Sequence, residues 1–199
     1  MPNWATGTLK IRGAKDEIMK FCKEILGELE SNIGTVEWSF GEDISDEFEP
    51  DTLIASVNDE PHLCIWLKES NRNFVDMDSE VPYYWDLSRK EIEGTNKYKY
   101  QTAFYIYNLD KKDDSFDDCL VVFPFKSAWG LREEYFEDLT RKYKLEIKIY
   151  VVEQGVGYYS EECFKGGKII KGDWGPKEDD HDKSYGAFVW ECPFPFLGG

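Results

Sequence analysis

Histidine, cysteine and clustered acids are the side chains that most often carry catalysis or bind metals, and this chain has few of them in a useful spacing. Of its two histidines, His62 follows a proline at an expected turn, and His181 lies in the acidic run Glu178–Asp182. The run could bind a metal weakly, but a solvated loop is the usual structure of such a sequence. The five cysteines form no Cys-x-x-Cys pair, so neither a zinc site nor a disulfide framework is predicted.

Sequence motifs for known reactions are also missing. Asp76-x-Asp78-x-Glu80 resembles the start of a calcium loop, but Val81 and Leu87 stand where the turn glycine and the bidentate acid belong. The chain contains no phosphate-binding loop, dinucleotide fingerprint or nucleophile elbow. We therefore predict no catalytic residue, no metal and no cofactor.

One constellation of residues could bind a partner. It consists of an acid at the end of a predicted strand, two glycines that would let a partner approach the backbone, and two aromatic rings that could line a shallow pocket. Its members are Trp129, Glu153, Gly155, Gly157 and Tyr158. A structural interpretation stays open beside it, in which Trp129 packs against a helix start, the glycines form a bulge and Glu153 caps a turn.

A strand–helix–strand unit must position these residues. The apolar residues Leu131, Tyr135, Leu139 and Tyr143 recur at every fourth position and predict a helix over 131–143. The preceding Cys119–Phe125 is almost continuously apolar, which favours a central strand, and we end its paired part at Pro124 because proline lacks a donor. The following Leu145–Glu153 alternates and predicts a strand with one buried face.

The N-terminal part of the chain predicts a second unit of the same kind. Thr6–Ile11 is a candidate strand, a helix runs from Lys15 to about Glu30, and Thr35–Phe40 is the next strand. Further strands are expected in the rest of the chain, including a hairpin around Gly166-Gly167. They cover Leu53–Val57, Leu63–Leu67, Lys97–Tyr107, Glu162–Phe164, Lys168–Lys171 and Tyr185–Glu191, while 69–80 is expected to be irregular.

Together the two units predict an α+β fold, a ferredoxin-like split βαβ sandwich with a mainly antiparallel sheet and two helices on one face. Thr6–Ile11 and Cys119–Phe123 would lie at the sheet centre, and Leu145–Glu153 at one edge. We predict a single domain over the whole chain. Its core would comprise residues 1–40 and 119–160, with an insertion at 41–118 and a C-terminal extension at 161–199.

The charge and the apolar content restrict the partners. The net charge of −16 opposes direct binding to nucleic acids and to anionic membranes, since both need a positive field. The N-terminus carries no basic and then apolar signal region, and no apolar run approaches the length that spans a membrane. We expect a cytoplasmic protein whose partner is another protein; its oligomeric state stays open.

Several of these residues resemble a known family. Met1-Pro2-Asn3-Trp4, Trp129 before the second predicted helix, and Glu153-x-Gly155-x-Gly157-Tyr158 are similar to the YubB-like family. The resemblance covers roughly residues 1–40 and 119–160. It implies a ferredoxin-like fold and an origin in a phage or plasmid, and it implies no established activity.

Three classes of function follow from this sequence. The first is a non-catalytic, mobile-element-encoded module that uses acidic loops and exposed tyrosines to bind a host or phage protein. The second is a DNA mimic whose acidic loops, Glu42–Asp51, Asp113–Asp118 and Glu178–Asp182, imitate phosphates and inhibit a nucleic-acid-binding protein. A metal-dependent hydrolase ranks last, because the histidines are few and no motif supports it.

Overall fold

The computed structural model describes residues 3–29, 35–40, 52–57, 64–70, 72–76, 88–91, 98–108, 118–153, 155 and 157–176. This part of the chain holds two helices and one sheet in which every pair of strands is antiparallel. The helices are α1 (Lys15–Ile25) and α2 (Glu133–Tyr143). The strands are β1 (Trp4–Ala14), β2 (Glu28–Leu29), β3 (Val36–Phe40), β4 (Thr52–Val57), β5 (Cys64–Trp66), β6 (Asn73–Asp76), β7 (Ser88–Glu91), β8 (Tyr98–Asn108), β9 (Asp118–Ala128), β10 (Glu146–Glu153), β11 (Tyr158–Lys165) and β12 (Lys168–Pro176).

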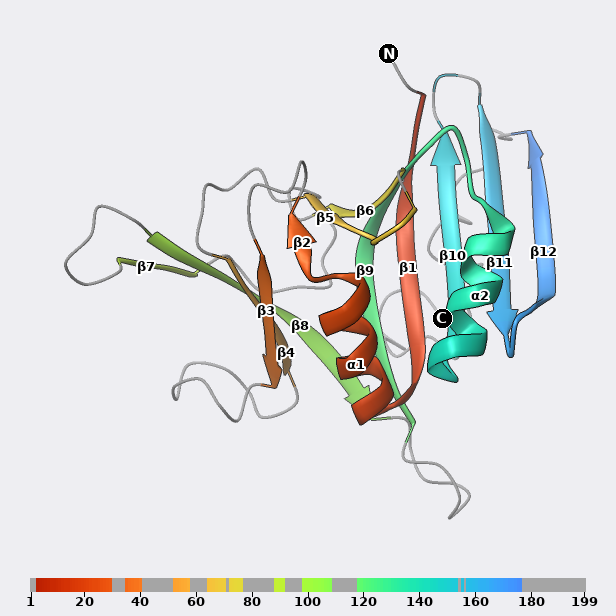
Figure 1. Cartoon of the computed structure of the whole chain (residues 1–199). Helices are drawn as coiled ribbons and strands as arrows, with labels where there is room; N and C mark the ends of the chain where they lie inside the picture. The colour runs from red at the N-terminus through yellow and green to blue at the C-terminus, as the bar shows by residue number, and fades with distance from the viewer. Residues whose placement is uncertain are drawn as a thin grey trace.

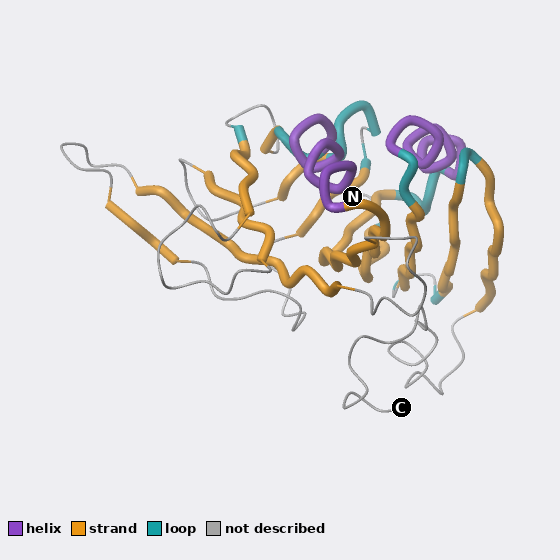
Figure 2. The backbone as a smooth tube through the Cα atoms, turned by 90° about the horizontal axis from the view of Figure 1, so that it is seen from below, coloured by secondary structure: helices purple, strands orange, loops and turns teal. Residues whose placement is uncertain are grey.

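Both helices cover the same face of the sheet, as Figures 1 and 2 show. β1 lies at the centre between β9 and β10, so the unit β9–α2–β10 encloses a strand from the other half of the chain. This is the split βαβ arrangement, and the predicted α+β class with two helices on one face is confirmed. The predicted central position of Thr6–Ile11 and Cys119–Phe123 is confirmed as well.

The far side of β9 is divided between two strands. β8 pairs with residues 119–121 and β6 pairs with residues 125–127, so Pro124 has no partner on that side. The prediction that pairing stops at Pro124 is wrong, because β9 continues to Ala128 with Thr8 of β1 opposite the proline. A proline is tolerated in this strand because its missing donor can fall in the gap between β8 and β6.

Each helix packs through part of the apolar stripe that its sequence predicts. The predicted start of the second helix at residue 131 is wrong, because α2 begins at Glu133 and Leu131 precedes it. In α1 the buried side chains are Ile18, Met19, Phe21, Cys22 and Ile25, and in α2 they are Phe136, Leu139, Thr140 and Tyr143. The two helices meet where the rings of Phe21 and Tyr143 pack edge to face, with centroids 5.6 Å apart. The predicted end of the first helix at about Glu30 is wrong: α1 ends at Ile25, Gly27 follows, and Glu28–Leu29 forms β2. A glycine favours such an end because it costs more backbone entropy in a helix than other residues do.

The C-terminal side of the sheet extends further than predicted. Leu145–Glu153 was expected at an edge, and this is wrong, because the β11–β12 hairpin continues the sheet beyond β10. The turn of this hairpin is the predicted Gly166-Gly167, and both glycines have positive φ, 58° and 78°, as a tight hairpin turn requires. The prediction that 69–80 is irregular is wrong over Asn73–Asp76, where a short buried strand contributes Phe74 and Val75.

Several predictions fall outside the described residues. These are the acidic loops over 42–51, 113–117 and 178–182, the strand at 185–191, and both histidines. In the part that is described, no helix is long and apolar enough to cross a membrane.

The sheet face without helices buries charged side chains. Lys148 Nζ lies 2.6 Å from Glu161 Oε1, and both side chains are almost fully buried. Lys10 of β1 lies directly opposite Lys148 of β10 and is also buried. Burial of an ion pair requires close approach and good geometry to offset the loss of hydration, so this face is built around charge pairing as well as apolar contact.

Candidate functional site

Most of the predicted site residues converge at one end of the sheet. The strand register places Asn73, Ser127, Ala5, Glu153 and Tyr158 at one level on five neighbouring strands. Trp129 follows Ala128 at the end of β9, so it lies at the same end. Strand alternation puts this row on the face that carries the helices, and its first four members are almost fully buried.

Asn73 and Ser127 support the turn that presents Trp129. Ser127 Oγ lies 2.8 Å from Asn73 Oδ1 and 2.9 Å from the carbonyl oxygen of Gly130. One hydroxyl proton serves only one acceptor, and turning the amide over lets Asn73 Nδ2 donate to Ser127 while Ser127 donates to Gly130. That assignment satisfies both contacts of the Ser127 hydroxyl, so we prefer it, and it leaves Asn73 Oδ1 at the buried position that has no partner among the described residues.

Trp129 is held in an unusual conformation. Its φ is 66°, in the left-handed region, and Gly130 follows at 87°. The Trp129 amide donates a 3.1 Å hydrogen bond to the carbonyl of Asn3, and the Ala128 amide bonds to the carbonyl of Arg72. Trp129 is 64% exposed, so most of its surface lies in solvent, whereas the structural interpretation supposed that it packs against the helix start.

Glu153 and the two glycines form a capped turn. Glu153 is buried, and its Oε1 accepts a 2.8 Å hydrogen bond from the amide of Gly155. The amide of Gly157, whose φ is 77°, donates to the carbonyl of Glu153. A β-carbon on Gly155 would come within 2.8 Å of that carboxylate, so a side chain there would disturb the cap. These three residues therefore shape the turn, as the structural interpretation supposed.

Tyr158 connects this turn to Trp129. Its hydroxyl approaches Gly130 so closely that a β-carbon on the glycine would be 3.0 Å from it. Burial raises the pKa of the Tyr158 phenol, and the nearby carboxylates of Glu153 and Glu162 raise it further. A tyrosine phenol is protonated at neutral pH even without this shift, so Tyr158 can donate a hydrogen bond beside the tryptophan.

Sequence reasoning missed Ser160 and Glu162 on β11 and Glu133 on α2. Glu162 is 9% exposed, and its Oε1 accepts a 2.8 Å hydrogen bond from Ser160 Oγ. Burial raises the pKa of Glu162, the Ser160 hydrogen bond partly opposes this, and the Glu133 carboxylate raises it again. The alternation Tyr158, Ser160, Glu162, Phe164 was the available signal, but the predicted strand began only at Glu162.

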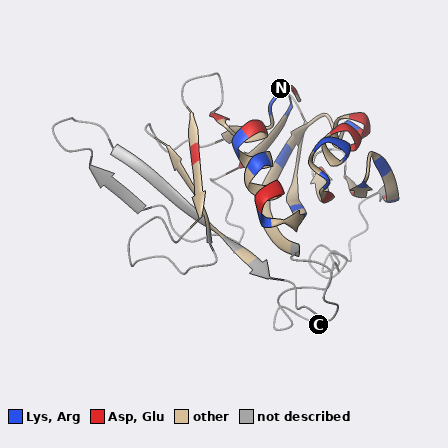
Figure 3. Ribbon diagram, turned by 60° about the horizontal axis from the view of Figure 1, so that its bottom comes forward, with Lys and Arg blue, Asp and Glu red and all other residues tan. Residues whose placement is uncertain are grey.

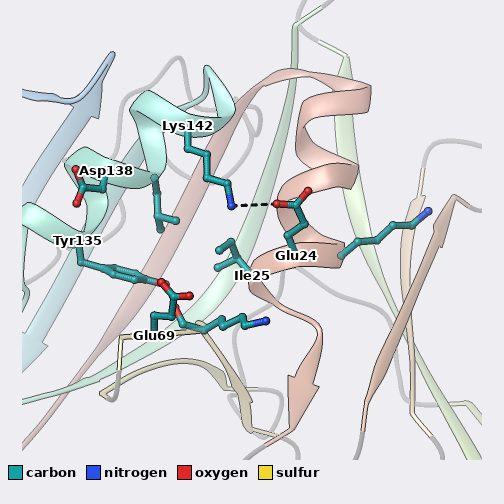
Figure 4. A pocket seen from close by; sticks show the side chains of 9 residues that line it. Glu24, Ile25, Glu69, Tyr135, Asp138 and Lys142 are labelled. Carbon is teal, nitrogen blue, oxygen red and sulfur yellow. Dashed lines mark hydrogen bonds and ion pairs between the residues drawn. The ribbon is translucent and has the colours of Figure 1, made fainter.

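A second concave region lies between the two helices, with a volume of about 490 Å³ (Figure 4). Lys142 Nζ lies 3.1 Å from Glu24 Oε2 and bridges α2 to α1. On the other side the hydroxyl of Tyr135 donates to the carbonyl of Lys68 at 2.7 Å. The lining residues are Lys23, Glu24, Ile25, Lys68, Glu69, Tyr135, Asp138, Leu139 and Lys142. Lysines and acids are present in equal number here, and the Lys142–Glu24 pair ties the two helices together.

Metal binding finds no support in the described residues, where no group of three or more His, Cys, Asp or Glu could hold an ion. The aromatic corner at Trp129 and Tyr158 is therefore the strongest candidate site. The corner can offer an exposed ring, a phenol donor and nearby carboxylates to a partner.

Comparison with known proteins identifies the family to which the chain belongs. Residues 83–187, more than half of the chain, match the model of the ferredoxin-like domain in Api92-like protein. The searches of curated proteins and of solved structures gave no match. The matched segment contains Trp129, all of α2, and the turn from Glu153 to Tyr158. This chain belongs to the family of ferredoxin-like domains in Api92-like proteins.

Proposed function

We propose that this protein is a non-catalytic module that binds another protein, with Trp129 as its anchor. The observation that carries the proposal is that a 64% exposed tryptophan is held at a φ of 66°. A left-handed conformation costs about 1–2 kcal/mol for a residue other than glycine. Strain of this kind persists where the surrounding structure enforces it, often at binding sites. Tryptophan is also enriched among residues that dominate the energy of protein interfaces.

The strand ends next to the anchor are packed on the sheet face opposite the helices. Trp4, which pairs with Ala128 next to the anchor, is 37% exposed, and its ring packs edge to face with Phe74 at 5.6 Å. The ammonium of Lys126 lies 5.0 Å from the centre of the Trp4 ring. A surface that is already ordered in the free protein loses little entropy when a partner binds, which favours affinity.

The origin and location of the protein are part of the same proposal. The Met1–Trp4 segment, Trp129 and the Glu153–Tyr158 motif support a closer kinship with the YubB-like family, and that kinship suggests a phage or plasmid origin. The net charge of −16 supports a protein partner over direct contact with nucleic acid or an anionic membrane. We infer that the protein acts in the cytoplasm.

The test uses two exposed apolar residues as a matched pair. Wild type, Trp129→Ala and Ile170→Ala are immobilised, exposed to a bacterial lysate, and the captured partner is then titrated in purified form. Ile170 is 57% exposed on β12, away from the corner, and serves as the control. We expect Trp129→Ala to weaken binding by about 2 kcal/mol, ~30-fold in Kd, and Ile170→Ala to leave it unchanged. Equal affinities of wild type and Trp129→Ala would contradict the proposal.

The same titration at two salt concentrations separates this function from DNA mimicry. A mimic binds through screened charges, so its affinity falls steeply with salt, whereas an aromatic anchor keeps most of its affinity. On the described helices Lys and Arg alternate with Asp and Glu, as Figure 3 shows, and this distribution favours the plain module. Steep salt dependence that Asp→Asn changes at 113, 114, 117 and 118 abolish would instead support the mimic.

A further inference from the structure

Two acids, one on α2 and one on β11, lie next to the contact that joins this helix to this strand. Phe136 of α2 packs on Phe164 of β11 with ring centroids 5.5 Å apart, which fixes the helix over the strand. Glu133 lies one helical turn before Phe136, and Glu162 lies two residues before Phe164 on the same face of β11. The two carboxylates are close enough that Glu133 raises the pKa of Glu162.

One oxygen of the buried acid of this pair lacks a hydrogen-bond donor. Glu162 is about nine-tenths buried, and while Oε1 accepts from Ser160, Oε2 has no hydrogen-bond partner. Among the residues that the structure describes, no lysine or arginine forms an ion pair with Glu133 or Glu162. Among the described residues, the phenol of Tyr158 lies near Glu162 as well, and the carboxylate of Glu153 acts on that phenol too. A buried carboxylate normally has a cation or several donors, so this site is incomplete.

We propose that Glu133 and Glu162 receive the guanidinium or ammonium group of a basic side chain of the partner protein. The inference rests on the proposed function and names the chemistry of the partner at the same corner. Glu133 is exposed in the first turn of α2, so a side chain from outside reaches the buried acid past it. A guanidinium suits two neighbouring carboxylates because it offers five donors in a planar fork.

Trp129 adds a second contact for the same side chain. It precedes Glu133 by four residues and lies at the same end of α2, with its ring in solvent. Aromatic faces attract cations and also pack against the alkyl part of arginine or lysine. A metal ion is the less suitable occupant, because the described residues include no group of three ligands. The corner therefore recognises a basic residue by charge, donor geometry and stacking together.

The test uses a short peptide in which arginine alternates with glycine, and a matched peptide with citrulline, which keeps the shape of arginine without its charge. The protein variants are Glu162→Gln, Glu133→Gln and the control Glu134→Gln, which removes one charge from an exposed neighbour on α2. We expect Glu162→Gln and Glu133→Gln each to weaken arginine-peptide binding about tenfold, and Glu134→Gln less than about twofold. The citrulline peptide should not bind.

Several results would overturn the inference. Equal weakening in all three variants would mean that the peptide responds only to the net charge. Spermidine binding as tightly as the arginine peptide, with the same dependence on Glu162, would indicate a free polyamine. Calcium or magnesium binding that Glu162→Gln abolishes, without arginine-peptide binding, would indicate a metal site.

Two further measurements are needed. The first distinguishes a loss of binding from a loss of stability, and the second distinguishes the proposed function from the acid-pair inference. Glu162→Gln removes a charge repulsion, so the free variant should melt at the same temperature as wild type or higher. A lower melting temperature would show that Glu162 serves stability and would overturn the inference. If Trp129→Ala loses the natural partner while both Glu→Gln variants keep it, the proposed function stands and the acid pair fails. If Trp129→Ala keeps the partner, the proposed function fails, and the peptide titration decides the acid pair separately.

Discussion

The hydroxyl of Tyr143 donates a 2.8 Å hydrogen bond to Oε2 of Glu24 and joins the last turn of α2 to α1. Lys142 approaches the same oxygen at 3.1 Å. The Tyr143 hydrogen bond is the largest cause that lowers the pKa of Glu24, and Lys142 contributes after it. The Glu24 carboxylate of α1 thus links this helix to α2 through two side chains.

Tyr143→Phe should bring the pKa of Glu24 back toward its ordinary value near 4.5. A carboxyl whose pKa is lower in the folded than in the unfolded protein contributes stability above the unfolded pKa, and this contribution is lost on acidification. The variant should therefore lose less stability than wild type as the pH falls below about 4.5. An NMR titration of the Glu24 carboxyl carbon measures the shift, with Tyr159→Phe as a control hydroxyl on β11. An unchanged pKa would remove the role assigned to Tyr143.

Leu139→Ala should lower the free energy of unfolding by about 2–5 kcal/mol, because it removes buried methyl groups and leaves a cavity under α2. Glu134→Ala, on the exposed face of the same helix, should change it by less than about 0.5 kcal/mol. Urea unfolding of both variants tests the orientation of the helix. Equal midpoints would mean that this assignment of the buried face is wrong.

Gly7→Ala should be far more damaging than Gly166→Ala. A β-carbon on Gly7 would collide with the carbonyl oxygen of Tyr150 on the neighbouring strand, and central strands cannot move apart without losing their pairing. We expect a cost of about 3 kcal/mol or more. A β-carbon on Gly166 meets nothing within 4 Å, so only its left-handed backbone is strained, at about 1 kcal/mol. Thermal melts of the two variants compare these costs, and a milder effect at Gly7 would contradict the close approach of β1 and β10.

Glu162 should make wild-type stability decline as the pH rises above about 4.5. Burial raises its pKa in the folded protein, with Ser160 opposing and Glu133 reinforcing the shift. The folded state then binds the proton more tightly than the unfolded state, so this stabilisation is present at acid pH and is lost as the pH passes through the folded pKa. Chemical unfolding over a pH series should show a flatter profile in Glu162→Gln, while Glu134→Gln keeps the wild-type slope. Parallel profiles for all three proteins would argue against a shifted Glu162.

The features that the sequence predicted well are those that repeat locally. The stripes that include Phe21 and Leu139 identified both helices, and the alternation of Ile147, Ile149 and Val151 identified β10. β6 was missed because it has only four residues, too few for a period to stand out. The end of β9 was predicted wrongly at Pro124. Whether a strand accepts a proline depends on which strands flank it, and that is a property of the whole sheet.

The candidate site was predictable to a similar degree. Trp129 and Tyr158 follow β9 and β10, and these parallel strands of a split βαβ unit end at the same side of the sheet, so their proximity follows from the expected topology. The proximity of Glu133 and Glu162 was not predictable. It depends on α2 lying over β11, and the part of this strand that holds Glu162 falls in the predicted extension at 161–199, outside the predicted core.

Because β1 lies at the centre of the sheet, separating it from the rest of the chain would divide the protein into two fragments that need each other. The family segment, residues 83–187, contains β9 and β10 but not the strand that hydrogen-bonds to both. Expressed by itself, that segment would leave two rows of backbone donors and acceptors open. Residues 1–29, which carry β1 and α1, form a natural second fragment. A break after residue 29 would separate β1 and α1 from the strands that pair with β1. We expect such fragments to fold only when they are brought together, which is the property that a split reporter uses.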